Sequence, residues 1–128
     1  MAAPNRYAEV RDPLYKIRFH LYHAPEARLV ARCKRDGEVV EAHNGAGRCL
    51  FYQAPGFGQL VVHLWFSPNT DLRTPFGVSC VAHEAVHAAH AVFEHVGCAP
   101  TFAWHADEPY AYYVEWIVRE TIRRLGGR

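Results

Sequence analysis

The chain has 128 residues, half of them hydrophobic, with three Trp, seven Tyr and seven Phe, and a formal net charge of +1. This apolar content is enough for the core of one folded domain and argues against disorder, so we treat residues 1–128 as a single domain. The charge near zero argues against a large surface for nucleic acid or another polyanion.

The cysteines and the lengths of the apolar runs indicate the cellular compartment of the protein. The four cysteines are scattered along the chain and form no CxxC pair. The first residues lack the apolar stretch of a signal peptide, and no apolar run is long enough to span a bilayer. We therefore expect a cytoplasmic protein with reduced thiols that binds neither membrane nor nucleic acid.

The first half of the chain has the residue pattern of β-strands. Residues 14–22 alternate apolar Ile17, Phe19 and Leu21 with polar or charged side chains. This alternation is the period of a half-buried strand. The pattern of residues 26–35 fits a strand and a short helix equally well.

Turn-forming residues predict two β-hairpins. The first has residues 36–37, Asp-Gly, as its turn before the β-branched residues 39–40. The second joins strands 49–53 and 59–66 through the Gly/Pro-rich loop 54–58. Strand 59–66 is long and apolar, and an unpaired edge there would bind an extended peptide by strand addition. Most of its apolar side chains are typical of packing, and we expect His63 at the surface.

The second half of the chain has the pattern of helices. Thr74 and Pro75 suit the N-cap and first position of a helix, and Gly97 suits its C-terminal cap. Asp107 is the N-cap candidate of a last helix that runs to about Leu125. The elements together predict an α+β fold, with an N-terminal antiparallel β-sheet followed by two helices.

The first of these helices contains His83, Glu84 and His87 in the sequence HEAVH. His83 and His87 lie about 40° apart around a helix axis, so both imidazoles can bind one zinc ion. Glu84 lies about 100° from His83 and reaches the edge of the same site, where it can take a proton from a metal-bound water. This HExxH arrangement of zinc metallopeptidases predicts a Zn²⁺ cofactor and hydrolysis of peptide bonds with Glu84 as general base.

A catalytic zinc needs a third protein ligand and an open position for water. The sequence offers three carboxylates, which we rank in the order Glu108, Glu115 and Glu94. Glu108 comes first because it begins the last helix, which the preceding connection can bring back antiparallel to the HExxH helix. Glu115, two turns later on the same face, is the alternative ligand or a partner that orients a ligand histidine. His105 is the candidate for polarising a substrate carbonyl.

The segments HEAVHAAHAVFEHVG and DEPYAYYVEWIVRE resemble the small gluzincin-like zinc metallopeptidases encoded in phages and prophages, which have a strand before HExxH and a later E-P-x-A-Y element. The similarity covers roughly residues 60–120. It implies a minimal zincin-like fold, with His83 and His87 as ligands, Glu84 as base and Glu108 as third ligand. It also implies a peptide or protein substrate, a location in the bacterial host cell or the virion, and contact with other virion proteins.

The chain departs from the larger gluzincins four residues after Glu108. Those proteins carry an acid there that orients a histidine, whereas this chain has Tyr112. We expect Tyr112 to face the metal and donate a hydrogen bond to a developing oxyanion.

Two other readings of the sequence stay open. In the first, the protein is a non-catalytic virion or assembly protein that keeps a zincin-like fold, with or without a structural metal. A fourth coordination position closed by His90 or a cysteine would favour it. In the second, the protein is a binding module in which HExxH is incidental, and this reading predicts no metal.

Overall fold

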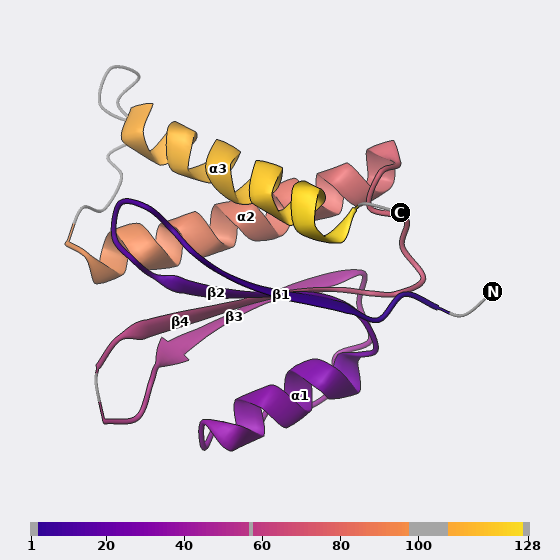
Figure 1. Cartoon of the computed structure of the whole chain (residues 1–128), viewed down its shortest axis with the longest axis horizontal. Helices are drawn as coiled ribbons and strands as arrows, with labels where there is room; N and C mark the ends of the chain where they lie inside the picture. The colour runs from indigo at the N-terminus through magenta and orange to yellow at the C-terminus, as the bar shows by residue number, and fades with distance from the viewer. Residues whose placement is uncertain (1–2, 57, 98–107, 127–128) are drawn as a thin grey trace.

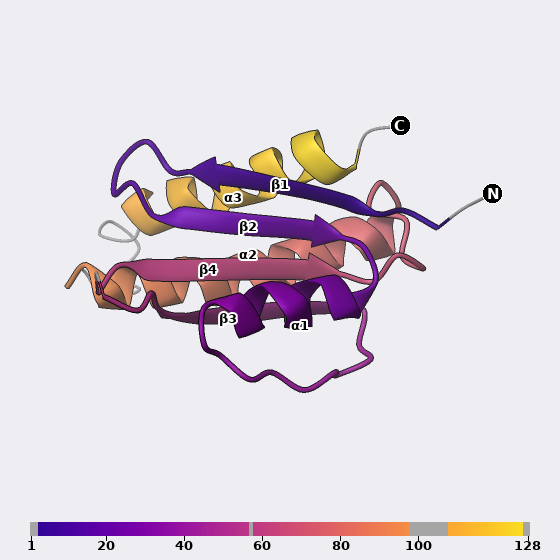
Figure 2. The same cartoon turned by 60° about the horizontal axis from the view of Figure 1, so that its bottom comes forward.

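The computed structural model describes residues 3–56, 58–97 and 108–126. Its elements in chain order are β1 (Arg6–Arg11), β2 (Arg18–His23), α1 (Glu26–Arg35), β3 (Gly47–Gln53), β4 (Leu60–Phe66), α2 (Pro75–His95) and α3 (Glu108–Leu125). The strands form one sheet in the order β1-β2-β4-β3. Helices α2 and α3 cover one face of the sheet, and α1 lies on the other face (Figures 1 and 2). The predicted α+β class is confirmed.

The sheet is mixed, so the prediction of an antiparallel sheet is wrong. β1 pairs antiparallel with β2 and β3 pairs antiparallel with β4, but β2 and β4 run parallel. The cause is α1, because residues 26–35 form a helix that crosses the sheet between β2 and β4. A parallel pair of strands needs such a crossover, whereas an antiparallel pair can be joined by a tight turn.

The two predicted hairpins have different outcomes. β3 and β4 pair antiparallel from Gln53 opposite Leu60, which confirms the second hairpin. The first is wrong, because Asp36 and Gly37 end α1 instead of joining two strands. The Gly37 backbone has a φ of +83°, and its N–H donates to the Lys34 carbonyl at 3.0 Å, as in a helix C-terminal cap. The chain then continues as an irregular segment in which Val39 is 91% exposed.

β4 is a central strand, so residues 59–66 offer no unpaired edge for strand addition. All seven residues of β4 are buried, between β2 on one side and β3 on the other. A strand covered on both faces has a continuous apolar run, which explains its sequence. Within the described ranges β3 pairs with β4 alone, so the free edge on this side of the sheet belongs to β3.

Both predicted helices are confirmed, and the ends of α2 follow the predicted signals. The Thr74 side chain accepts a hydrogen bond from the Gly77 N–H at 3.0 Å, and Gly97 has a φ of +78° after the last turn of α2. The face of α2 that packs on the sheet is rich in small residues, including Ala85 and Ala88. These short side chains let α2 approach the sheet and α3 closely.

The layer between the sheet and α1 holds buried histidines, which corrects the prediction of a surface position for His63. The rings of His20 and His63 stack with their centroids 4.7 Å apart. Hydrogen bonds join His20 Nδ1 to the Tyr7 hydroxyl at 2.6 Å and His63 to the hydroxyls of Tyr22 at 2.8 Å and Tyr52 at 2.7 Å. Burial lowers the pKa of His20 to about 3 and that of His63 to about 4.

We expect the free energy of unfolding to fall as the pH drops from about 6.5 to 4, because these two rings are neutral in the fold and protonate more readily when unfolded. Their contribution to the free energy of unfolding is complete above the pKa of histidine in the unfolded chain. Below that pKa, and down to the pKa in the fold, each ring lowers the free energy of unfolding by about 1.4 kcal/mol per pH unit. The carboxylate of Glu9, 3.9 Å from His20, is 40% exposed and does not outweigh burial. Urea unfolding with a chelator at pH 7.5, 6 and 5 measures the slope.

The matched comparison is His63→Gln against His95→Gln, since His95 is exposed at the end of α2. The His63 variant is expected to have a shallower pH slope, and the His95 variant the slope of the wild type. A wild-type free energy that stays level from pH 7.5 to 5 would contradict the expectation.

Candidate metal centre

His83, Glu84 and His87 come together on α2 as the helical spacing predicts. One possible ligand atom from each residue lies within 4.8 Å of those from the other two. The imidazole centroids of His83 and His87 are 4.9 Å apart, with the ring planes at 72°. Among the described residues this is the group of His, Cys, Asp and Glu side chains placed to hold a metal ion.

The three side chains differ strongly in exposure. The His83 side chain is 68% exposed and that of Glu84 only 10%, while Glu84 Oε2 lies 4.0 Å from His83 Nε2. Glu84 packs against the start of β3, where a Cβ added to Gly47 would lie 3.3 Å from its Cγ. The absence of a side chain at position 47 therefore lets the strand cover the carboxylate closely.

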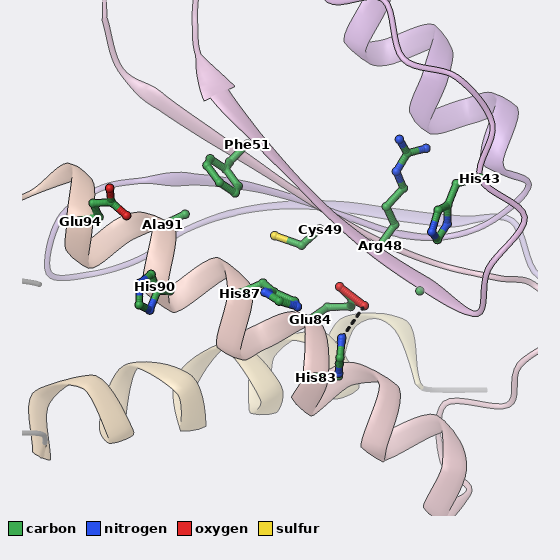
Figure 3. A pocket seen from close by; sticks show the side chains of 11 residues that line it. His43, Arg48, Cys49, Phe51, His83, Glu84, His87, His90, Ala91 and Glu94 are labelled. Atoms are coloured by element: carbon green, nitrogen blue, oxygen red, sulfur yellow. Dashed lines mark ion pairs between the residues drawn. The ribbon is translucent and has the colours of Figure 1, made fainter. Parts of the chain in front are cut away.

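A cavity of about 570 Å³ lies between α2 and β3, with the two histidines on its wall (Figure 3). The lining residues from α2 are His83, Glu84, His87, His90, Ala91 and Glu94, and those from β3 and the preceding loop are His43, Gly47, Arg48, Cys49 and Phe51. The edge strand and the HExxH helix therefore form the two sides of one open groove.

The strand side of the cavity carries the thiol of Cys49, a cysteine that no sequence motif singles out. Burial, and then the charge of Glu84, raise the pKa of Cys49 to about 12. Burial and Glu84 also raise the pKa of Cys80, one turn before Glu84 on α2. Cys33, Cys49 and Cys80 are free thiols. The alternation of residues 47–53 was the available signal, because it places Cys49 on the same face of the strand as Gly47 and Phe51.

The structure does not bring the predicted third ligands on α3 to the two histidines. Glu108 and Glu115 are exposed, and neither lines the cavity. Glu115 instead accepts a hydrogen bond from Arg119 at 3.1 Å. Tyr112 is 64% exposed and is also absent from the cavity wall.

The buried face of α3 explains these positions. Tyr110, Tyr113 and Ile117 pack into the core, and the Tyr110 hydroxyl donates to the Val86 carbonyl of α2 at 3.1 Å. Glu108 lies roughly 160° around the helix from Tyr110, so it points away from that face. Helix α3 packs on α2 and over β1 and β2, whereas the cavity lies between α2 and β3.

Of the remaining candidate residues, two line the cavity and two lie outside the described part of the chain. Glu94 and His90 line the cavity further along α2 than His83 and His87. The predictions for His105 and Asp107 concern positions outside the described residues.

In comparisons with known proteins, no family model, curated protein or solved structure matches this chain. No helix in the described part of the chain is both long enough and apolar enough to cross a membrane. Function is therefore inferred from the residues and geometry of the cavity between α2 and β3.

Proposed function

We propose that this protein is a zinc-dependent metallopeptidase in which His83 and His87 hold the metal. The observation that carries the proposal is the group of His83, Glu84 and His87, whose ligand atoms lie within 4.8 Å of one another on the wall of an open cavity. Two imidazoles on one helix suit zinc. Both histidines are exposed, so an ion reaches them without disturbing the core.

Glu84 is the proposed general base. A zinc ion held by His83 and His87 would lower the pKa of a coordinated water toward 7 and would polarise a carbonyl group. The Glu84 carboxylate accepts the proton of the attacking water and passes it to the leaving amine. Packing of Glu84 against Gly47 fixes the carboxylate near His83, so little reorganisation is needed for the proton transfer.

The edge strand supports a peptide as the substrate. β3 runs along α2, with Gly47 against Glu84 at one end and Phe51 above Ala91 further on (Figure 3). An extended peptide that pairs with the free edge of β3 would pass over the two histidines. Phe51, which is 53% exposed, would then contact a side chain of the peptide.

A second candidate is a structural metal site in a virion or assembly protein. It is favoured by the Cys49 thiol on the opposite wall, because two histidines, Glu84 and Cys49 would together close a zinc site. Such a site has no position for water and no hydrolytic activity.

Zinc content tests the proposal directly. We expect about one zinc per chain in untagged wild-type protein, measured by elemental mass spectrometry, because the helical pair is preformed. His83→Ala and His87→Ala are expected to lose the metal, since each removes one of two imidazole ligands. His95→Ala, an exposed histidine on the same helix outside the cavity, is the matched control and keeps it. A wild-type protein that stays free of zinc when zinc is offered would refute the proposal.

A further inference from the structure

The proposed metal site still lacks a third protein ligand, and this inference rests on that site. Glu108 and Glu115 of α3 are on the face opposite its buried residues. On α2 itself, Glu94 lies seven residues beyond His87, which is about 10 Å along the helix axis. His90 likewise lies seven residues beyond His83, the same distance along the helix axis. Bonds to zinc are only about 2 Å long, so one ion does not bridge these separations and the third ligand comes from the opposite wall.

The register of β3 against α2 indicates which residue of that wall lies nearest. Gly47 is opposite Glu84, and Phe51 lies above Ala91 (Figure 3). Side chains two apart on a strand share a face, so Cys49 lies between Gly47 and Phe51 on the wall that lines the cavity. It therefore faces the turn of α2 that contains His87. Figure 3 shows the Cys49 side chain on the wall across from His87 and Glu84.

We propose that Cys49 is the third protein ligand of the zinc ion, binding as a thiolate beside His83 and His87. Thiolate sulfur is a preferred zinc ligand, with a bond of about 2.3 Å. On binding, the S–H bond breaks, the sulfur electron pair forms the bond to zinc, and the proton leaves to solvent. Cys49 lies outside the group whose atoms are within 4.8 Å, so its side chain closes toward the histidines when the ion binds.

Two other donors near the histidines are less well placed. His43 lines the cavity from the irregular segment before β3, where its side chain is exposed. Cys80 lines a smaller cavity with His83 and Glu84 that does not include His87. With Cys49 as the ligand, Glu84 stays free to act as base and the fourth coordination position stays open to water.

Cobalt substitution tests the ligand without relying on activity. A thiolate bound to Co²⁺ gives a sulfur-to-metal charge-transfer band in the near ultraviolet, which imidazole and carboxylate ligands do not give. We expect the band in the cobalt-loaded wild type and its loss in Cys49→Ser. We expect it unchanged in Cys80→Ser, in Cys33→Ser, whose thiol is buried on the α1 side of the sheet, and in Glu108→Ala.

Zinc affinity is the second measurement. Cys49→Ser is expected to weaken zinc binding by more than the roughly 10–100-fold that loss of an outer-shell partner costs. Circular dichroism of the metal-free variant, which should match the metal-free wild type, shows that the fold is intact.

The outcomes separate this inference from the proposed function. A charge-transfer band that persists in Cys49→Ser overturns the inference while the zinc site stands. If the wild type binds metal but shows no charge-transfer band, and Glu108→Ala no longer binds metal, the third ligand is the carboxylate on α3 and the inference is overturned. A wild type that binds no metal overturns the proposed function and the Cys49 ligand together.

Discussion

Glu84→Gln is expected to keep its zinc and to lose about 10²–10⁴-fold in peptide hydrolysis. The amide has the shape of the carboxylate and preserves the packing against Gly47, but it cannot accept a proton from water. Turnover of a fluorogenic peptide mixture and zinc content, measured on the same samples, give the two readouts. Glu94→Gln is the matched control, because this carboxylate lies on the same wall further along α2 and should change turnover only slightly.

The pair of readouts also separates the candidate functions. Unchanged turnover in Glu84→Gln would rule out Glu84 as the base. Loss of zinc together with absence of wild-type turnover would make Glu84 a ligand of a closed, structural site.

Gly77→Ala is expected to destabilise the fold by about 3 kcal/mol or more. A Cβ at this position would lie 2.0 Å from the Asp71 carbonyl oxygen and 2.6 Å from the Leu72 Cα. Both are backbone atoms, so no side-chain rotation relieves the clash, and the start of α2 must move. Urea unfolding of the purified variant at neutral pH measures the loss.

Gly97→Ala is the comparison for this variant. Gly97 has a φ of +78° and nothing within 4 Å of an added Cβ, so its substitution has a conformational cost of about 1–2 kcal/mol and no steric one. If Gly77→Ala cost no more than Gly97→Ala, the close contact between α2 and the Asp71–Leu72 backbone would be wrong.

Local signals in the sequence were enough to predict α2, α3 and the hairpin of β3 and β4. Each depends on neighbours in the chain, such as the Thr74 cap or the glycines of loop 54–58. The parallel pairing of β2 and β4 depends on α1, whose residues fit a strand equally well. As a helix, the segment buries Leu29 and Cys33 against Tyr22 and Trp65 on the far face of the sheet, a contact between distant segments.

The candidate site also has one part that local sequence signals predict and another that depends on tertiary packing. The i, i+4 spacing of His83 and His87 was sufficient to predict their side of the cavity. The alternation of β3 groups Cys49 with Gly47 and Phe51, but only the packing of β3 on α2 shows that this face lines the cavity. For α3, the helical period places Glu108 opposite Tyr110, so the apolar positions of this segment already indicate that Glu108 points away from the core.

The central position of β4 bears on how small a working fragment of this protein can be. The helices that contain HExxH and Glu108 both follow β4 in the chain, yet β4 is buried between β2 and β3. A fragment starting there would have a hydrophobic strand with two bare edges, which favours aggregation. It would also lack one wall of the cavity. His83 and His87 would therefore not form the same site in such a fragment, because the opposite wall of the cavity comes from residues earlier in the chain.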